Sequence, residues 1–192
     1  SKAIGGGVMI KCKKRASSSI GYVFLFLIVM LLFIISMYMT QVAKLMTHQH
    51  HVDDALADSV LASLVADDVY YFETLETVGT PVVRFDDVDE SYDIFKDCMM
   101  DAVSGTNGFY YNFSIDSFSC YEVEGSNIRI TTFGNGVRSV TTGRVGEVRA
   151  PTGEIVTKTS AYGKVRFDIK SIFDGSYVTK TKDIYCALEI NE

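Results

Sequence analysis

Hydrophobic residues are concentrated in one unbroken run at residues 20–39. Thirteen of these 20 residues are Leu, Ile, Val or Phe, and no charged residue occurs between Arg15 and Lys44. A helix of this length covers about 30 Å, the thickness of the hydrocarbon core of a bilayer. Tyr22 and Tyr38 lie near its ends, where aromatic rings favour the headgroup level. The run predicts a transmembrane helix. The alternative, a buried core helix, rarely avoids polar residues for this long.

The helical pattern continues beyond this run. Neither Gly nor Pro, the two strongest helix breakers, occurs between Gly21 and Gly79. Apolar residues recur at intervals of four, forming an amphipathic stripe that Asp53 interrupts: Val52, Leu56, Val60 and Leu64. We therefore expect one helix of about 70 Å over residues 18–66. Its outer half needs a partner for the stripe, either the chain's own C-terminal domain, a neighbouring subunit, or both.

The remaining residues predict a mixed domain. Residues 67–88 break the helical pattern, and a short second helix is expected over 90–103 with Gly105 as its stop. From residue 109 the period changes to two, which predicts strands at 109–115, 118–123, 128–133, 165–169 and 184–190. Turn residues separate them at 116–117, 124–127, 134–136 and 174–175. The predicted fold class is α+β: a long N-terminal transmembrane helix packed on a C-terminal antiparallel sheet with one buried face.

Charge divides the chain in the same way. Residues 1–52 carry six Lys/Arg and no Asp/Glu, whereas the rest carry 12 Lys/Arg and 24 Asp/Glu. Because most basic residues precede the apolar run, the positive-inside rule places the N-terminus in the cytoplasm. We expect a basic cytoplasmic stub at 1–19, a transmembrane helix with its extension at 20–66, and an extracytoplasmic α+β domain at 67–192. An acidic exterior argues against binding nucleic acid, which needs a basic face.

Two kinds of processing are open at the N-terminal end. The apolar run is longer than the core of a secretory signal, about 7–15 residues, and residues 40–43 form a poor cleavage site. Cleavage before the run is the other option. Small residues at 17–21 precede it, so a prepilin-type peptidase would cut between Gly21 and Tyr22. Met9 is a candidate initiator.

The cysteines suggest one disulfide. Cys98, Cys120 and Cys186 lie in the exterior part, and Cys12 lies in the cytoplasmic stub, where a free thiol is expected rather than lipidation. We expect Cys120 to pair with Cys186, because both occupy apolar strand contexts; the odd cysteine is left over or pairs between chains. Three reduced, buried thiols are the alternative.

The histidines argue against an enzyme. His48, His50 and His51 all follow the apolar run, so none remains in the sheet domain to pair with a Ser or Cys nucleophile. His48 and His51 are one helical turn apart and could bind a metal, but no Cys lies nearby, and no carboxylate is closer than Asp53 and Asp54. We interpret them as interfacial residues on a solvated face, and expect no enzymatic activity.

Two further sequence patterns contain the residue types of ligand sites, one for calcium and one for phosphate. Alternating oxygen-bearing residues, Asp87, Asp89, Ser91 and Asp93, are spaced like calcium-loop ligands. The turn Gly and terminal Glu of an EF-hand are missing, so we favour carboxylates placed at a helix N-terminus. The glycines at 134–136 form a turn and those at 5–7 follow no strand, so neither is a phosphate loop. We expect no cofactor and no metal.

The layout resembles the type IV pilin-like proteins, most of all the TadE-like minor pilins of tight-adherence systems. The matching features are basic residues at 11–15, small residues at 17–21, the span directly after them and the helix that continues outward. The resemblance implies cleavage before Tyr22 and a helix that assembles with pilin-like subunits or copies of itself, through Val23, Phe26, Leu27, Met30, Leu31 and Ile34. Pilins that polymerise carry a Glu at the fifth position of the cleaved chain, where this sequence has Phe26. An uncleaved or accessory subunit is therefore implied more readily than a major pilin.

Two functions follow as hypotheses. The first is a structural subunit of a bacterial surface appendage or of a secretion or conjugation apparatus, assembling in the membrane through van der Waals packing of bulky side chains. The second is a membrane-tethered extracytoplasmic domain that binds or senses a ligand.

Overall fold

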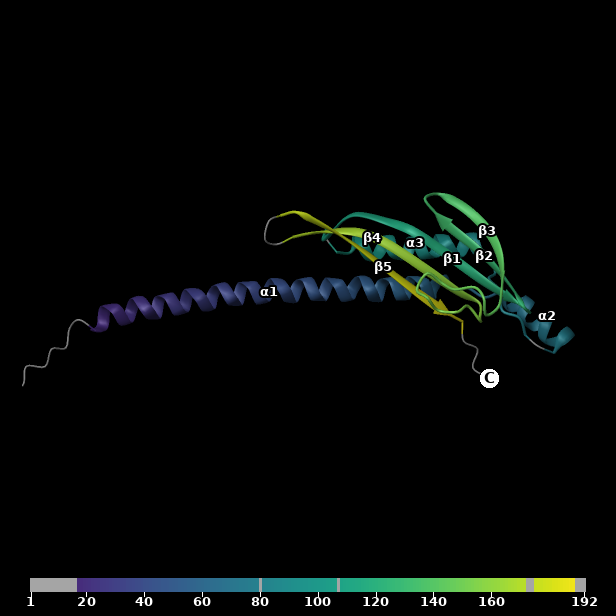
Figure 1. Ribbon diagram of the computed structural model, residues 1–192, viewed down its shortest axis with the longest axis horizontal. Coiled ribbons are helices and arrows are strands. Elements are labelled where there is room, and N and C mark those ends of the chain that lie inside the picture. Colours follow the sequence, from purple (N-terminus) through teal and green to yellow (C-terminus); the bar gives the residue numbers. More distant parts are fainter. Residues whose placement is uncertain (1–16, 80, 107, 172–174, 189–192) are drawn as a thin grey trace, which may run out of the picture. The chain divides into compact units, whose positions relative to one another are not determined.

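The computed structural model describes residues 17–79, 81–106, 108–171 and 175–188. Within these residues it contains three helices and five strands (Figure 1): α1 (Ser17–Ser63), α2 (Asp68–Val78), α3 (Val88–Ser104), β1 (Tyr110–Glu124), β2 (Asn127–Gly134), β3 (Val137–Arg144), β4 (Ser160–Lys170) and β5 (Tyr177–Ala187). The predicted α+β class is confirmed at this level, as one long apolar helix with a five-stranded antiparallel sheet and a short helix. Residues 1–16 of the predicted basic stub, Cys12 among them, and Asp174 of the last predicted turn lie outside the described residues.

The chain divides by its contacts into two compact units, Ser1–Met46 and Thr47–Glu192. The described part of the first unit is the apolar portion of α1. The second unit, here named the head, contains the remainder of α1 with α2, α3 and the sheet. The helical segment Thr47–Ser63 therefore belongs with the sheet, whereas the sequence interpretation grouped it with the apolar run.

The sheet has the strand order β3-β2-β1-β4-β5, and every neighbouring pair is antiparallel. Two predicted hairpin connections are confirmed: β1 to β2 at residues 125–126, and β2 to β3 at Asn135 and Gly136. Asn135 has φ 49° and Gly136 has φ 76°. Two consecutive positive φ values define the turn type whose twist suits a tight hairpin, which explains why Asn-Gly stands there.

Strand β1 corrects one prediction. The turn expected at Asp116 and Ser117 does not form, and a single strand of 15 residues replaces the two short ones. Its register with β4 shifts between Tyr111 and Ser114 and again between Ile115 and Ser117. Turn-forming residues are therefore accommodated as irregularities inside a long strand. Asp116 is held there by Arg166 of β4, with Nη2 2.7 Å from Oδ2.

Helix α2 corrects a second prediction, because residues 67–88 were expected to lack a helix. The Asp67 carboxylate accepts a hydrogen bond from the Tyr70 N–H at 2.9 Å, and Gly79 ends the helix at φ 73°. These are ordinary start and stop signals. The apolar residues between them bury no stripe: Val69, Phe72, Leu75 and Val78 are all exposed. A periodicity search misses such a helix, since it depends on one buried face.

The outer part of α1 and helix α3 pack on the same face of the sheet. The predicted stripe is confirmed at Val52, Leu56 and Val60, which are at most 2% exposed. Phe95 of α3 stacks on Phe118 of β1, with ring centroids 4.7 Å apart. The head's own sheet therefore supplies the partner that the stripe requires.

The opposite face of the sheet is also covered at one end, so the prediction of one buried face is wrong there. Segment 145–157 folds over it and completes a core of buried residues, namely Tyr121, Ile128, Ala150, Val156 and Tyr162. Val148 lies on Gly143 of β3, and its Cγ2 occupies the space that a Cβ at this position would need. A side chain at Gly143 would displace this segment.

Candidate functional site

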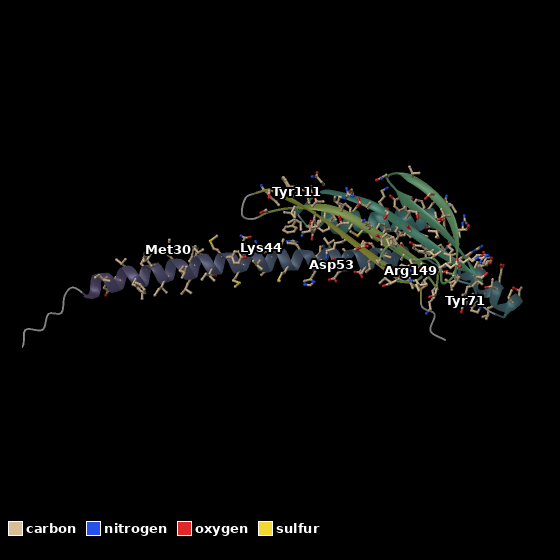
Figure 2. All side chains as sticks on the ribbon, viewed as in Figure 1. Met30, Lys44, Asp53, Tyr71, Tyr111 and Arg149 are labelled. Atoms are coloured by element: carbon tan, nitrogen blue, oxygen red, sulfur yellow. The ribbon has the colours of Figure 1, made fainter. Side chains whose placement is uncertain are left out.

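The apolar portion of α1 is exposed along its whole described length. Every side chain from 20 to 39 is exposed, and the predicted assembly residues are between 46% and 62% exposed: Val23, Phe26, Leu27, Met30, Leu31 and Ile34. Their spacing of three and four residues places them on one face of the helix. Figure 2 shows the side chains of this portion, Met30 among them, projecting from the ribbon. A surface this apolar needs lipid or other helices to cover it.

Among the described residues, one helix is long and apolar enough to cross a membrane. Its most apolar 18-residue window has a mean hydropathy of 2.8, and none of that window is buried within the protein. A core helix of a soluble domain would be mostly buried. This portion of α1 is therefore a candidate membrane span.

The predicted processing site lies inside α1. Gly21 and Tyr22 are both helical, and Tyr22 is 73% exposed. No atom lies within 4 Å of the position that a Cβ on Gly21 would take. Glycine in a helix interior costs about 1 kcal/mol relative to alanine, and packing within the chain does not require it here. Cleavage between these residues stays a prediction.

Polar contacts join the outer part of α1 to the rest of the head. Asp53, which interrupts the apolar stripe in the sequence, pairs with Lys182 of β5, whose Nζ lies 2.8 Å from Oδ1 and 2.9 Å from Oδ2. The Tyr110 hydroxyl donates to the His48 carbonyl. Burial raises the pKa of Tyr110 to about 12, with a smaller contribution from Asp53. This hydroxyl therefore stays protonated and able to donate at neutral pH.

The three histidines do not converge. His48 stacks on Phe109 with ring centroids 4.0 Å apart, the Nε2 of His51 lies 3.3 Å from the Ala102 carbonyl oxygen, and His50 is exposed. No group of three or more His, Cys, Asp or Glu residues able to hold a metal occurs in the part of the chain that the structure describes. His48 and His51 therefore make separate contacts within the head.

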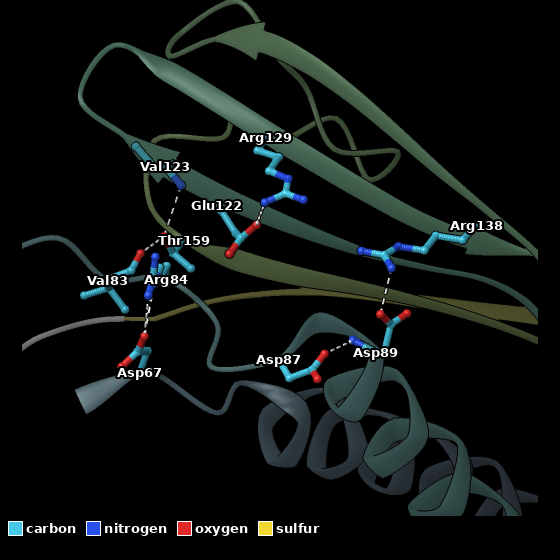
Figure 3. A network of polar contacts seen from close by, with 10 residues as sticks. All are labelled: Asp67, Val83, Arg84, Asp87, Asp89, Glu122, Val123, Arg129, Arg138 and Thr159. Atoms are coloured by element: carbon cyan, nitrogen blue, oxygen red, sulfur yellow. Dashed lines mark hydrogen bonds and ion pairs between the residues drawn. The ribbon is translucent and has the colours of Figure 1, made fainter. Parts of the chain in front are cut away.

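The residues spaced like a calcium loop have separate structural roles (Figure 3). Asp87 is the N-cap of α3, accepting from the Asp89 N–H at 2.8 Å and the Glu90 N–H at 3.4 Å. Asp89 pairs with Arg138 of β3 at 2.7 Å. Ser91 is fully buried and Asp93 is exposed. Asp87 and Asp89 therefore fit the favoured interpretation, in which carboxylates lie at a helix N-terminus.

A polar cluster beside α2 is not predicted from the sequence (Figure 3). Arg84 places Nη2 2.8 Å and Nε 3.0 Å from Asp67 Oδ2, and its guanidinium lies 3.7 Å from the centre of the Tyr70 ring. The N–H of Tyr70, and then Arg84, hold the pKa of the Asp67 carboxyl below its usual value. The Thr159 hydroxyl donates to the Val83 carbonyl and accepts from the Val123 N–H. These contacts hold the segment after α2 on the sheet, which is a structural role.

The predicted disulfide does not form. Cys98, Cys120 and Cys186 are all free. Cys120 of β1 pairs with Ala161 of β4, and Ala161 pairs with Cys186 of β5, so a whole strand separates the two cysteines. Two strand spacings amount to about 10 Å between Cα atoms, whereas a disulfide spans at most about 7 Å. The three thiols are reduced, as in the alternative, but only Cys120 is buried; Cys98 and Cys186 are partly exposed.

No family model, curated protein or solved structure matches this chain. What the fold itself defines is a class: an α+β head whose core helix is continuous in sequence with a candidate membrane span.

Proposed function

We propose that this chain is a structural, non-enzymatic, pilin-like subunit of a bacterial surface appendage or of a secretion or conjugation apparatus. The proposal rests on one observation: α1 has two parts with different surroundings. Its outer stripe is buried in the head, while its apolar portion buries nothing within the chain. A helix with an uncovered apolar surface on a well-packed head is suited to assembly with other helices or to residence in lipid.

The proposed mechanism is lateral packing of α1 in the membrane. Lipid removes the hydrophobic drive between helices, so association depends on van der Waals contact between side chains. The face formed by Val23, Phe26, Leu27, Met30, Leu31 and Ile34 offers bulky ridges for such packing. The partners are membrane lipid and other pilin-like subunits or copies of this chain.

The topology of the proposal comes from charge. Basic residues at 11–15 precede the span, which places the N-terminus in the cytoplasm and the head outside the cell, as in a single-pass protein. The resemblance to TadE-like minor pilins supports the same arrangement. Because Phe26 stands where polymerising pilins have Glu, we favour an accessory subunit over a major pilin.

A site-specific crosslinking experiment tests the assembly face. Phe26 and Phe24 are 62% and 65% exposed and lie on opposite sides of α1, which makes them a matched pair. A photoreactive side chain at Phe26 should form protein–protein crosslinks in cells, and one at Phe24 should react mainly with lipid. Equal protein crosslinking from both positions contradicts the assigned face.

Two further measurements separate the proposal from its alternative. Electron microscopy of sheared surface material, with an antibody to the head, should find this chain in filaments or in an envelope complex. A chain present only as single molecules in membranes supports the alternative, a membrane-tethered extracytoplasmic binding or sensor domain. Intact mass of the native protein decides whether the chain begins at Tyr22 or retains its basic stub.

A further inference from the structure

One end of the head presents exposed aromatic and basic side chains together. Tyr111 of β1 and Tyr177 of β5 meet edge to face, with ring centroids 5.1 Å apart, and are 39% and 54% exposed. Tyr177 pairs in register with Lys170 at the end of β4. Lys170 is exposed. Lys180, three residues farther along β5, pairs with the buried Phe167 and therefore points to the opposite face of the sheet. Figure 2 shows Tyr111 at the end of the head where β4 and β5 are joined.

A cavity of about 300 Å³ opens at the same end. Its lining comes from three parts of the head, namely His48 of α1, the segment with Thr106, Gly108 and Phe109, and Tyr111 with Lys170 from the sheet. The ring of His48 is fixed there by its stacking on Phe109. The cavity therefore presents an ammonium group, an imidazole and a hydroxyl around a space large enough for a phosphate group.

This end of the head includes residues that follow the apolar run closely along the chain. His48 follows Met46, the last residue of the first unit, by two residues and the end of the apolar run at Met39 by nine. Nine helical residues rise about 14 Å, and the headgroup layer adds about 5–8 Å beyond the hydrocarbon core. The distance left between His48 and the headgroup layer is comparable to the length of one extended lysine or tyrosine side chain. Tilting of the span shortens this distance.

The residues named at this end differ in type from the average composition of the head. Beyond residue 52 the chain carries twice as many Asp/Glu as Lys/Arg. At this end the carboxylate of Asp168 accepts from Asn112 at 2.7 Å and from Thr179 at 2.6 Å, which hold it within the sheet surface. Tyrosine and lysine are the residues that favour the boundary between a membrane and water.

We propose that Tyr111, Tyr177, Lys170 and the His48 cavity form a surface that binds phospholipid headgroups of the bilayer in which α1 is anchored. Lys170 and the cavity receive headgroup phosphates, and the tyrosine rings lie at the headgroup level. The inference rests on the membrane anchoring in the proposed function. It adds that the head is held against the bilayer before assembly.

The absence of tryptophan from the sequence permits a direct test. Tyr111→Trp or Tyr177→Trp gives the full chain one fluorescent reporter, and Phe72→Trp on α2, where Phe72 is 60% exposed, is the matched control. Each variant is reconstituted into phosphatidylcholine–phosphatidylglycerol vesicles that contain a lipid with a nitroxide on its headgroup. Quenching should be several-fold greater at 111 and 177 than at 72. Equal quenching at all three positions overturns the proposal.

A reporter in the span separates this inference from the proposed function. Leu27→Trp should be quenched by a nitroxide placed in the middle of the acyl chain. If it is quenched while positions 111 and 177 are not, the anchor stands and the headgroup surface is wrong. If it is not quenched, the anchoring itself fails.

Charge removal tests the role of Lys170. In the Tyr177→Trp chain, Lys170→Gln should reduce the bound population roughly fivefold in anionic vesicles. The matched control, Lys96→Gln, removes the same charge elsewhere on the head and should leave quenching unchanged. Equal quenching in the two variants overturns phosphate binding at this surface.

Discussion

A methyl group of Val60 in α1 lies 2.8 Å from the point at which a Cβ on Gly163 of β4 would stand. The Phe95 ring of α3 lies at the same 2.8 Å from that point. Val60 and Phe95 are fully buried. Both helices reach the sheet at one residue because that residue has no side chain. Gly163 therefore sets how closely α1 and α3 pack on β4.

Replacing Gly163 with alanine should destabilise the head. The new methyl group overlaps two buried side chains that have no space to move into, and such overpacking costs about 1–3 kcal/mol. The melting temperature of the detergent-solubilised chain should fall by about 2–4 °C for each kcal/mol lost. Gly105→Ala is the control, because its nearest contact is an ordinary 3.7 Å and its φ is −64°. Equal melting of both variants would contradict the close packing at Gly163.

Asp87→Ala should destabilise the start of α3. The substitution removes the acceptor for two backbone N–H groups and should cost about 1 kcal/mol in the free energy of unfolding. Asp93→Ala, on the exposed side of the same helix, should change it little. Denaturant unfolding of both variants, repeated with added calcium, measures the effect. A large stabilisation by calcium that depends on Asp87 and Asp93 would instead favour the calcium-loop interpretation.

The pair of Asp67 and Arg84 should make stability depend on pH in the acid range. The folded state lowers the pKa of Asp67, so its contribution is fully present above the ordinary carboxyl pKa and is lost as pH falls through the lowered value. Asp67→Asn keeps an N-cap acceptor but loses the charge. This variant should be less stable than the native chain at pH 7, and the two should converge in acid. Denaturant unfolding at a series of pH values measures the difference, and parallel pH profiles of the variant and the native chain would contradict the role of this pair.

Cys120 should resist alkylation while the protein is folded. Its side chain is fully buried, and burial raises the pKa of its thiol, so little reactive thiolate forms. Iodoacetamide at mildly alkaline pH should label Cys98 before Cys120, and denaturant should make both react. A non-reducing peptide map should contain no bridge between Cys120 and Cys186. Recovery of that bridged peptide would contradict the strand order, which places β4 between them.

The hydrophobic periodicity and the turn residues of neighbouring positions are sufficient to predict part of this fold. The uninterrupted helix, its stripe at Val52, Leu56 and Val60, and the hairpin at Asn135 and Gly136 all depend on residues close in sequence. Those features are fixed by helical periodicity and turn geometry. The predicted membrane orientation, processing and assembly remain predictions.

Other features depend on register between distant strands. Nothing near Cys120 or Cys186 in the sequence indicates that Ala161 lies between them. The continuity of β1 through Asp116 likewise depends on Arg166, 50 residues away. The end of the head with Tyr111 and Tyr177 is assembled from three segments of the sequence, so no single stretch could predict it.

The cover that segment 145–157 places on the sheet has a consequence for how the head opens. Around Tyr121 and Tyr162 the central strands are shielded on both sides, whereas near Ser114 and Arg166 the side chains that face away from the helices are polar and exposed. Amide hydrogens at the shielded end should exchange with solvent most slowly, since they are released only by global unfolding. Local opening of the sheet should therefore begin at the irregular end of β1, near Ser114, and extend towards Tyr121.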